Sequence, residues 1–303
     1  MLGSRLKIKK ICTNINEELM FGITKNLSVT TKQRLKKIAK PLGVLKLKRA
    51  LDRRSFAMSY YAKKIKIINS WMWKDTEDVN FYYKLTAINQ DQLAQTVAVV
   101  TKVHYETICK YFDELETDAE LREHIKIGIS NAKYGRDIAV DFGRRLGWYA
   151  FIRALKPRIV VETGVDHGVG SCVITTALMK NASEGFLGHY YGTDINQDAG
   201  KLLSGKYHKF GQVLYGDSIE SLKKFEKKID IFINDSDHSA DYEYLEYQEI
   251  LNKLSENAVI LGDNSHVTDR LSQFSRETGR RFIFFSEKPI NHWYPGAGIG
   301  ISF

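Results

Sequence analysis

The stretch IVVETGVDHGVGS, residues 159–171, decides the fold that we predict for this chain. Its first three residues suit a buried strand, which runs into an acidic residue and a glycine-rich turn, and a helical pattern follows from Cys172. A strand, a glycine turn and a helix N-terminus in this order form the opening unit of a doubly wound sheet, whose turn can hold a phosphate or a nucleoside. Glycine turns after strands are common, so the residues that follow decide what this one holds.

The composition is that of an ordinary folded protein. With 303 residues, of which 43% are hydrophobic, the chain can build one large domain or two smaller ones. Three widely spaced cysteines predict neither a disulfide framework nor a zinc site, and a reducing compartment fits them best. No apolar run reaches the roughly 18 residues needed to span a bilayer, and the N-terminus lacks the apolar core of a secretion signal. We therefore expect a cytoplasmic protein.

Positive charge is concentrated in the N-terminal quarter. Residues 1–74 hold 19 Lys and Arg against 3 Asp and Glu, a net charge of +16, which leaves −7 for the rest of the chain. Residues 1–30 show no sustained period and are predicted to form a loosely held arm. A basic helical pattern covers 31–68, with a break at Pro41 and Gly43. This segment could contact an acidic membrane surface, a nucleic acid or an acidic partner. The alternative is a solvated basic face whose apolar stripe docks on the main domain.

Further helices are expected between the basic segment and the sheet. The pattern predicts them at about 90–116, 118–134 and 138–155, the first two preceded by the capping-type residues Asn89 and Thr117. The helical N-terminal region could cover the pocket or build a homo-oligomer.

After Pro157 the sequence changes to short runs of β-branched and aromatic residues. Seven strands are predicted, with the sequences RIVVET, GHYYGTD, QVLYG, IDIFIN, NAVILG, RRFIFFS and GIGISF. The segments between the first five are long enough for crossover helices, including one from Ser239 to Leu254, whereas an irregular stretch between the last two suits a hairpin-like return. We therefore predict an α/β Rossmann-like domain of five parallel strands plus an antiparallel pair over 149–303, after a helical region over 31–148.

The strand ends carry polar residues at the edge where such a sheet binds its ligand. Asp194 closes the second strand, where a carboxylate can accept the hydroxyl groups of a ribose, so a nicotinamide dinucleotide is the first candidate. However, Val173 stands where a third glycine would be needed after Gly168, and Glu162 would repel a pyrophosphate. Asp217, after the third strand, offers an acceptor for the amine of an adenine. The set favours a cationic nucleoside cofactor.

The succession ETGVDHGVG, Asp194, GDSIESL and a seven-strand pattern with a final antiparallel strand resembles the class I S-adenosylmethionine-dependent methyltransferases over about residues 145–303. The resemblance implies that the cofactor contacts lie on these motifs. The methionine part would be lined by Glu162, Gly164 and Gly168, the ribose by Asp194, and the adenine by Asp217 and Ser218. The alternative for the glycines is a tight turn without a ligand.

Oxygen-bearing side chains follow the fourth and fifth strands. If these strands are neighbours, Asp235, Asp263 and Asn264 would form an oxygen-ligand set for a hard divalent cation, with magnesium the expected ion. The run DSDH at 235–238 resembles the D-x-D-H that follows the fourth strand in metal-dependent O-methyltransferases of the catechol type and in related sugar and antibiotic O-methyltransferases. In those enzymes the metal orients a substrate hydroxyl and lowers its pKa. The resemblance implies that His238 is the base that removes the proton of this hydroxyl.

Alternatives remain open at these positions. Asp237 could be the first metal ligand in place of Asp235, and the whole group could instead cap helices, with Asp235 or Ser239 as the cap. His266 is a second candidate for the base. The aromatic residues at 292–294 could line the acceptor pocket.

The prediction for function is methyl transfer to a hydroxyl of a small molecule or saccharide. No proline follows the fourth strand, and no cysteine lies at a strand end, which disfavours methylation of nucleic-acid bases. The resemblance suggests a sugar of a polysaccharide or a secondary metabolite as acceptor. The alternatives are an NAD-dependent oxidoreductase and a non-catalytic binding module that uses its basic arm on membrane or nucleic acid.

Overall fold

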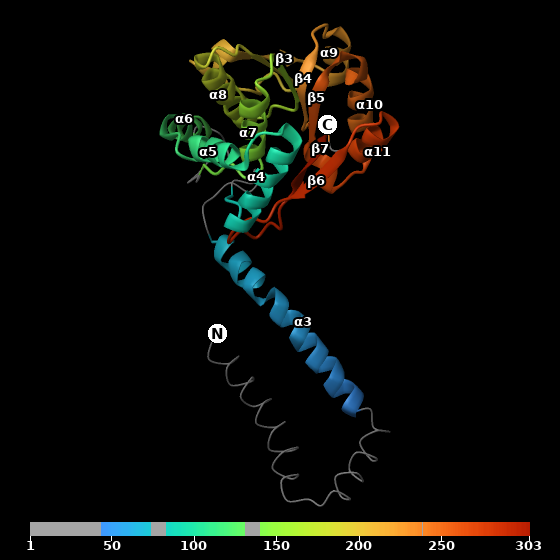
Figure 1. Cartoon of the computed structure of the whole chain (residues 1–303). Helices are drawn as coiled ribbons and strands as arrows, with labels where there is room; N and C mark the ends of the chain where they lie inside the picture. Colours follow the sequence, from blue (N-terminus) through green and yellow to red (C-terminus); the bar gives the residue numbers. More distant parts are fainter. Residues whose placement is uncertain (1–43, 74–82, 131–139, 238) are drawn as a thin grey trace, which may run out of the picture. The chain divides into compact units, whose positions relative to one another are not determined.

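A computed structural model of the chain is shown in Figure 1. It describes residues 44–73, 83–130, 140–237 and 239–303. The predicted arm, the first part of the predicted basic segment and the predicted base His238 lie outside the described residues. The chain forms two compact units, Met1–Asn69 and Ser70–Phe303.

The described part of the first unit, 44–69, belongs to a single long helix, α3 (Val44–Trp71). It confirms the predicted helical pattern after Gly43, and most of its side chains are exposed to solvent. None of the described helices combines the length and the apolar character needed to cross a membrane.

The second unit contains a seven-stranded sheet in the order β3-β2-β1-β4-β5-β7-β6. The strands are β1 (Ile159–Thr163), β2 (His189–Asp194), β3 (Gly211–Tyr215), β4 (Ile229–Asn234), β5 (Leu254–Gly262), β6 (Phe282–Ser286) and β7 (Gly298–Ser302). The first five are parallel, and β7 inserts antiparallel between β5 and β6. The predicted sheet of five parallel strands and an antiparallel pair is confirmed, and the order brings the ends of β1 and β4 together at its centre.

Helices cover both faces of this sheet (Figure 1). One layer contains α4 (Ala87–Thr101), α5 (Tyr105–Glu116), α6 (Ala119–Ser130), α7 (Arg145–Leu155) and α8 (Val169–Ser183). The other contains α9 (Ser218–Lys224), α10 (Ala240–Ile250) and α11 (Arg270–Glu277). In the first layer Trp148 and Phe151 of α7 are buried in one apolar core that also includes Ile231 of β4. The helices before the sheet therefore belong to the core of this unit, because burial of their apolar faces holds them on the sheet.

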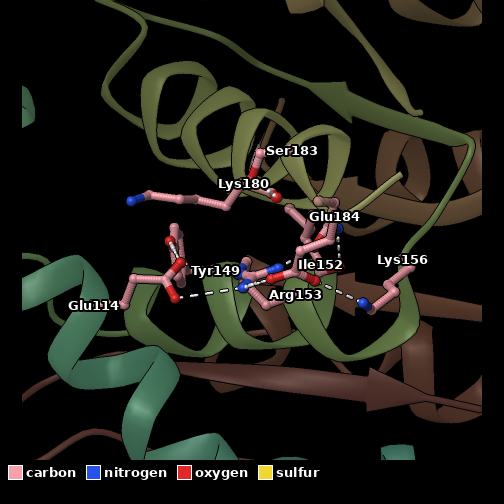
Figure 2. Close-up of polar contacts among 9 residues, drawn as sticks. Glu114, Tyr149, Ile152, Arg153, Lys156, Lys180, Ser183 and Glu184 are labelled. Atoms are coloured by element: carbon pink, nitrogen blue, oxygen red, sulfur yellow. Dashed lines mark hydrogen bonds and ion pairs between the residues drawn. The ribbon is translucent and has the colours of Figure 1, made fainter. Parts of the chain in front are cut away.

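A buried guanidinium ties α5, α7 and α8 together (Figure 2). Arg153 binds Glu114 at 2.9 Å and Glu184 at 2.6 Å. Tyr149 donates to Glu114, and Lys156 pairs with Glu184 at 2.7 Å. Since a buried charge is tolerated only when it is paired, this network fixes the relative positions of the three helices.

The helices before the sheet differ from the prediction in their ends. The predicted helix over 90–116 is two helices, because Lys102 adopts a left-handed conformation with φ 59° and ends α4. Thr86 caps α4 by accepting the N–H of Asn89, so Asn89 itself lies inside the helix. Thr117 ends α5 and does not begin α6. The predicted helix over 138–155 begins only at Arg145.

The connection between β2 and β3 contains only the short 3-10 helix η2 (Tyr207–Phe210) and no crossover α-helix. Instead, α6 packs against this connection: the ring of His124 is hydrogen-bonded to the carbonyl of Leu202 at 2.7 Å, and Glu120 pairs with Lys206 at 2.6 Å. A helix from the region before the sheet thus packs against the connection in which a crossover helix was expected.

Candidate active site

A cleft of about 900 Å³ lies at the carboxyl ends of the parallel strands. This is the edge where doubly wound sheets bind their ligands. Seven of the predicted site residues line it, namely Glu162, Gly164, Asp194, Asp217, Ser218, Asp235 and Asp263. Gly168 lies outside this lining and forms the turn before α8, with φ 93°. The strand ends that the sequence singled out therefore meet in one cavity.

Two glycines let the β1 turn approach its neighbours closely. Gly164 has a φ of 85°, and a Cβ atom there would clash with the backbone oxygen of Asp235. A Cβ atom on Gly170 would clash with the carboxylate of Glu162 and the ring of Trp148. The glycine pattern is thus required by the packing of the turn against β4 and α7, and it leaves the Glu162 carboxylate room at the cleft wall.

Glu162 is a buried acid at the end of β1. Its carboxylate accepts hydrogen bonds from the hydroxyl groups of Tyr190 and Ser171. Burial nevertheless raises the pKa of Glu162 to about 7, against the opposing effects of Tyr190 and of the Arg145 charge. A buried acid with this pKa is well suited to hold a cationic group, because a positive charge in the cleft would stabilise its ionised form.

Asp194, at the end of β2, is partly engaged by the backbone. Its Oδ2 accepts the N–H groups of Val165 and Asp166 at 3.0 Å each, and its Oδ1 accepts the N–H of Asn196 at 2.8 Å. A carboxylate has about four lone-pair positions, so roughly one is left for a ligand hydroxyl. Asp194 therefore holds the β1 turn as well as facing the cleft.

Asp217 and Ser218 form the far end of the cleft. Asp217 caps α9 by accepting the N–H of Glu220 at 2.9 Å, and this hydrogen bond is the main reason why the pKa of Asp217 is lowered. Tyr242 of α10 donates to Asp217 at 2.9 Å and is hydrogen-bonded to Ser218 at 2.9 Å. Tyr242 was not among the predicted residues, because only the fold brings α10 next to α9, the helix that follows the third strand.

The carboxyl groups of Asp235 and Asp263 lie together where β4 and β5 end. Burial and the neighbouring Asp263 charge raise the pKa of Asp235 well above its ordinary value. Arg144 binds Asp263 through Nε and, at 2.9 Å, through Nη2, and its other partner is Glu287 at 3.6 Å. The condition that the fourth and fifth strands are neighbours is met, which brings these two acids together, whereas Arg144, which binds Asp263, was not among the predicted residues.

Of the other residues predicted to bind the metal or act as the base, the structure describes only some. Asn264 lies in the 3-10 helix η4 (Asp263–His266), and His238 is outside the described residues. Within the described ranges no group of three His, Cys, Asp or Glu side chains is arranged to hold a metal ion. Asp237, the alternative first ligand, is exposed and accepts the N–H of Ser239, the N-cap residue of α10, at 2.8 Å. His266 lines the cleft.

A second buried acid, Glu246 of α10, links the strand ends below the cleft. It accepts hydrogen bonds from Thr163 at 3.0 Å, from Ser236 at 2.8 Å, and also from Asn234 and Ser218. Burial raises the pKa of Glu246 to about 7. The carboxylate thereby joins the ends of β1 and β4 to the start of α9.

Arg145 and Tyr294 also reach the cleft from outside the strand ends. Arg145 lines the cleft and packs against Trp148, with 5.7 Å between its guanidinium carbon and the ring centre. Its buried Nε has no hydrogen-bond partner among the described residues. Tyr294 is the one member of the predicted aromatic group at 292–294 that lines this cleft.

The sequence matches one known family. Residues 161–265 match a family described as a methyltransferase domain. No curated protein matches the chain significantly. This match confirms the prediction of a class I S-adenosylmethionine-dependent methyltransferase.

Several solved structures resemble the chain at low sequence identity. A methyltransferase from Geobacter sulfurreducens is 18% identical over 65% of this chain and 98% of that chain, with a TM-score of 0.46. An SAH-bound methyltransferase from Podospora anserina is 14% identical over 74% of this chain and 98% of that chain, with a TM-score of 0.44. An O-methyltransferase from Bacillus cereus in complex with SAH is 12% identical over 61% of this chain and 90% of that chain, with a TM-score of 0.43.

Proposed function

We propose that the protein transfers the methyl group of S-adenosylmethionine to a hydroxyl oxygen of a small molecule or saccharide, with the help of a divalent cation. The observation that carries this proposal is the pair of adjacent acids, Asp235 and Asp263, in the cleft that also contains Glu162. One end of the cleft suits a cationic nucleoside, and the acid pair suits a metal and an acceptor with neighbouring hydroxyl groups.

The cofactor end is supported by two opposite charges. Glu162 offers a buried carboxylate to the ammonium group of the methionine part, and Arg145 offers a guanidinium without a hydrogen-bond partner at Nε among the described residues to its carboxylate. Asp217 and Tyr242 lie at the other end, as an adenine would require. When bound, S-adenosylmethionine supplies an electrophilic methyl group, and the residues named here hold and orient it.

The metal is supported by the excess of acid near Asp235. Three carboxyl groups, those of Asp235, Asp263 and Glu287, interact with the guanidinium of Arg144, and Arg145 is a second cation that acts on Asp235. Burial and the neighbouring Asp263 charge raise the pKa of Asp235, and a further positive charge would offset both effects. Oxygen donors are those that magnesium prefers. Asp235, Asp263 and Asn264 would hold the ion, which would lower the pKa of an acceptor hydroxyl.

Proton removal from the acceptor is assigned to a histidine. His238, three residues after Asp235, is the proposed base, since a near-neutral imidazole can take the proton of an acidified hydroxyl. His266 is the alternative, because it lines the cleft and its Nδ1 is 3.0 Å from the carbonyl of Asp263. A cytoplasmic location and a sugar-like acceptor complete the proposal.

Calorimetry tests the cofactor first. We expect S-adenosylhomocysteine to bind and NADH not to bind, whereas the reverse would overturn the proposal. Release of S-adenosylhomocysteine is then measured with catechols, hexoses and nucleotide-linked sugars. Transfer to one of these acceptors is expected. Background rates with all of them, together with methylation of a nucleic acid or protein, would contradict O-methyl transfer to small molecules.

A further inference from the structure

The exposed helix α3 has one apolar side. Six large apolar residues follow each other at spacings of three, four or seven residues, which places them on one face: Leu47, Leu51, Met58, Tyr61, Ile65 and Ile68. Between 40% and 62% of each side chain is exposed. We call these six residues the apolar stripe, and at about 100° per residue they cover an arc of about 100°.

Lysines border the apolar stripe on both sides. Lys46 and Lys64 lie about 40° beyond one edge, and Lys48 and Lys66 lie about 60° beyond the other. Eight Lys and Arg against one Asp give α3 a net charge of +7. Arg54 interrupts the stripe, but a long arginine side chain can bury its methylene groups and still reach water with its charge.

We propose that α3 binds the surface of a membrane that contains anionic phospholipids, with the apolar stripe in the interface and the bordering lysines at the phosphate groups. An apolar arc flanked by Lys is the arrangement of helices that lie in a lipid interface, and clusters of four to eight basic residues on such helices favour anionic lipids. This inference concerns the first unit and is independent of the proposed chemistry.

Two other occupants fit the helix less well. The spacing of the apolar stripe is also that of a coiled coil, but a second copy would place Arg54 in the seam and bring two helices of +7 together. A nucleic acid would neutralise the charge, but its binding would leave the six apolar side chains without a function. A lipid surface uses both the charge and the apolar stripe.

The experiment uses the full chain and flotation with two kinds of vesicle, phosphatidylcholine alone and phosphatidylcholine mixed with phosphatidylglycerol. We expect binding to the mixed vesicles only. The double variant Leu51→Gln/Ile65→Gln removes two stripe residues and should weaken binding about tenfold or more. Its matched control is Phe56→Gln/Tyr60→Gln, because these residues are 81% and 82% exposed but lie off the apolar stripe. Glutamine has a helix propensity similar to that of leucine, so both variants keep the helix.

The control should bind like the wild type, and both variants should bind S-adenosylhomocysteine like the wild type. Three results would overturn the proposal. Equal binding of the stripe variant and the wild type would mean that charge alone acts. A dimer in sedimentation that the stripe variant abolishes, without vesicle binding, would assign the apolar stripe to a second copy. Tight binding of duplex RNA without vesicle binding would assign the helix to nucleic acid.

Discussion

Arg144 donates from Nη2 to Oδ2 of Asp263 at 2.9 Å, so that a residue preceding α7 binds the acid that follows β5. The backbone N–H of Arg144 also donates to Glu287 at 2.7 Å, and Tyr83 donates to Glu287 at 2.7 Å. The arginine is thus held from two sides, and it fixes the orientation of the Asp263 carboxylate. A metal at Asp263 has to share this carboxylate with Arg144.

This arrangement predicts that Asp263 contributes to metal affinity without contributing to cofactor affinity. The variant Asp263→Ala should lose Mn²⁺ binding in calorimetry but bind S-adenosylhomocysteine within about twofold of the wild type, because Asp263 follows β5, whereas the proposed contacts Glu162, Asp194 and Asp217 lie at the ends of β1, β2 and β3. Asp237→Ala is the control and should keep Mn²⁺ binding, since Asp237 is exposed and caps a backbone N–H. Loss of the metal in Asp237→Ala alone would move the first ligand to Asp237. Full turnover in EDTA would exclude the metal from the reaction.

The acid at the end of β1 predicts a pH dependence of cofactor binding. Burial raises the pKa of Glu162 to about 7, so the carboxyl group is neutral at lower pH and cannot attract the ammonium of the ligand. Affinity for S-adenosylhomocysteine should therefore rise from pH 5 to about pH 7 and then level off. Glu162→Gln should bind weakly with little change over this range. A wild-type affinity that is constant from pH 5 to 8 would show that Glu162 does not face the ammonium.

The same pKa values predict how stability depends on pH without ligand. Glu162 and Glu246 each have a pKa of about 7, raised from an ordinary value of 4.5. Between these values the folded state holds protons that the unfolded state has released, so the free energy of unfolding falls as pH rises from about 4.5 to 7. Each residue contributes roughly 3 kcal/mol to this fall. Urea titrations of Glu162→Gln and Glu246→Gln should show a shallower decline, and an unchanged slope would contradict the assignment.

Gly164 offers a test of the packing between the β1 turn and β4. Gly164 and Gly185 have similar φ values of 85° and 92°, but nothing lies within 4 Å of a Cβ at Gly185. Gly185→Ala should lower the free energy of unfolding only by the backbone strain of a left-handed alanine, about 1 to 2 kcal/mol. Gly164→Ala adds a clash with the backbone of Asp235, and thermal unfolding should show a loss larger by about 2 kcal/mol or more. Equal losses in both variants would mean that the close approach of the turn to Asp235 is relaxed in solution.

The seven strands, and their division into five parallel strands and an antiparallel pair, could be predicted because short β-branched runs alternate with helical patterns, and the crossover rules leave few topologies. The missing helix between β2 and β3 could not be predicted, since α6, from far earlier in the chain, covers that connection. Arg144 could not be found either. A basic pair before a helix is usually a surface feature, and its partners Asp263 and Glu287 are 119 and 143 residues away. Residues at strand ends can be predicted from the strand pattern of the sequence, whereas the residues that face them are known only once the tertiary fold is known.

Arg145 predicts a difference between two related ligands. S-adenosylhomocysteine has an amino-acid carboxylate, which 5′-methylthioadenosine lacks. If Arg145 binds that carboxylate, Arg145→Ala should lower the affinity for S-adenosylhomocysteine by about tenfold or more, because a hydrogen bond to a charged group is lost. The affinity for methylthioadenosine should change by less than about twofold. Arg145→Lys should recover part of the loss, because it keeps the charge but not the fork of donors. Equal losses for both ligands would assign Arg145 to the shape of the cleft, where it packs on Trp148. An unchanged affinity for S-adenosylhomocysteine would place the carboxylate elsewhere while leaving the methyltransferase assignment intact.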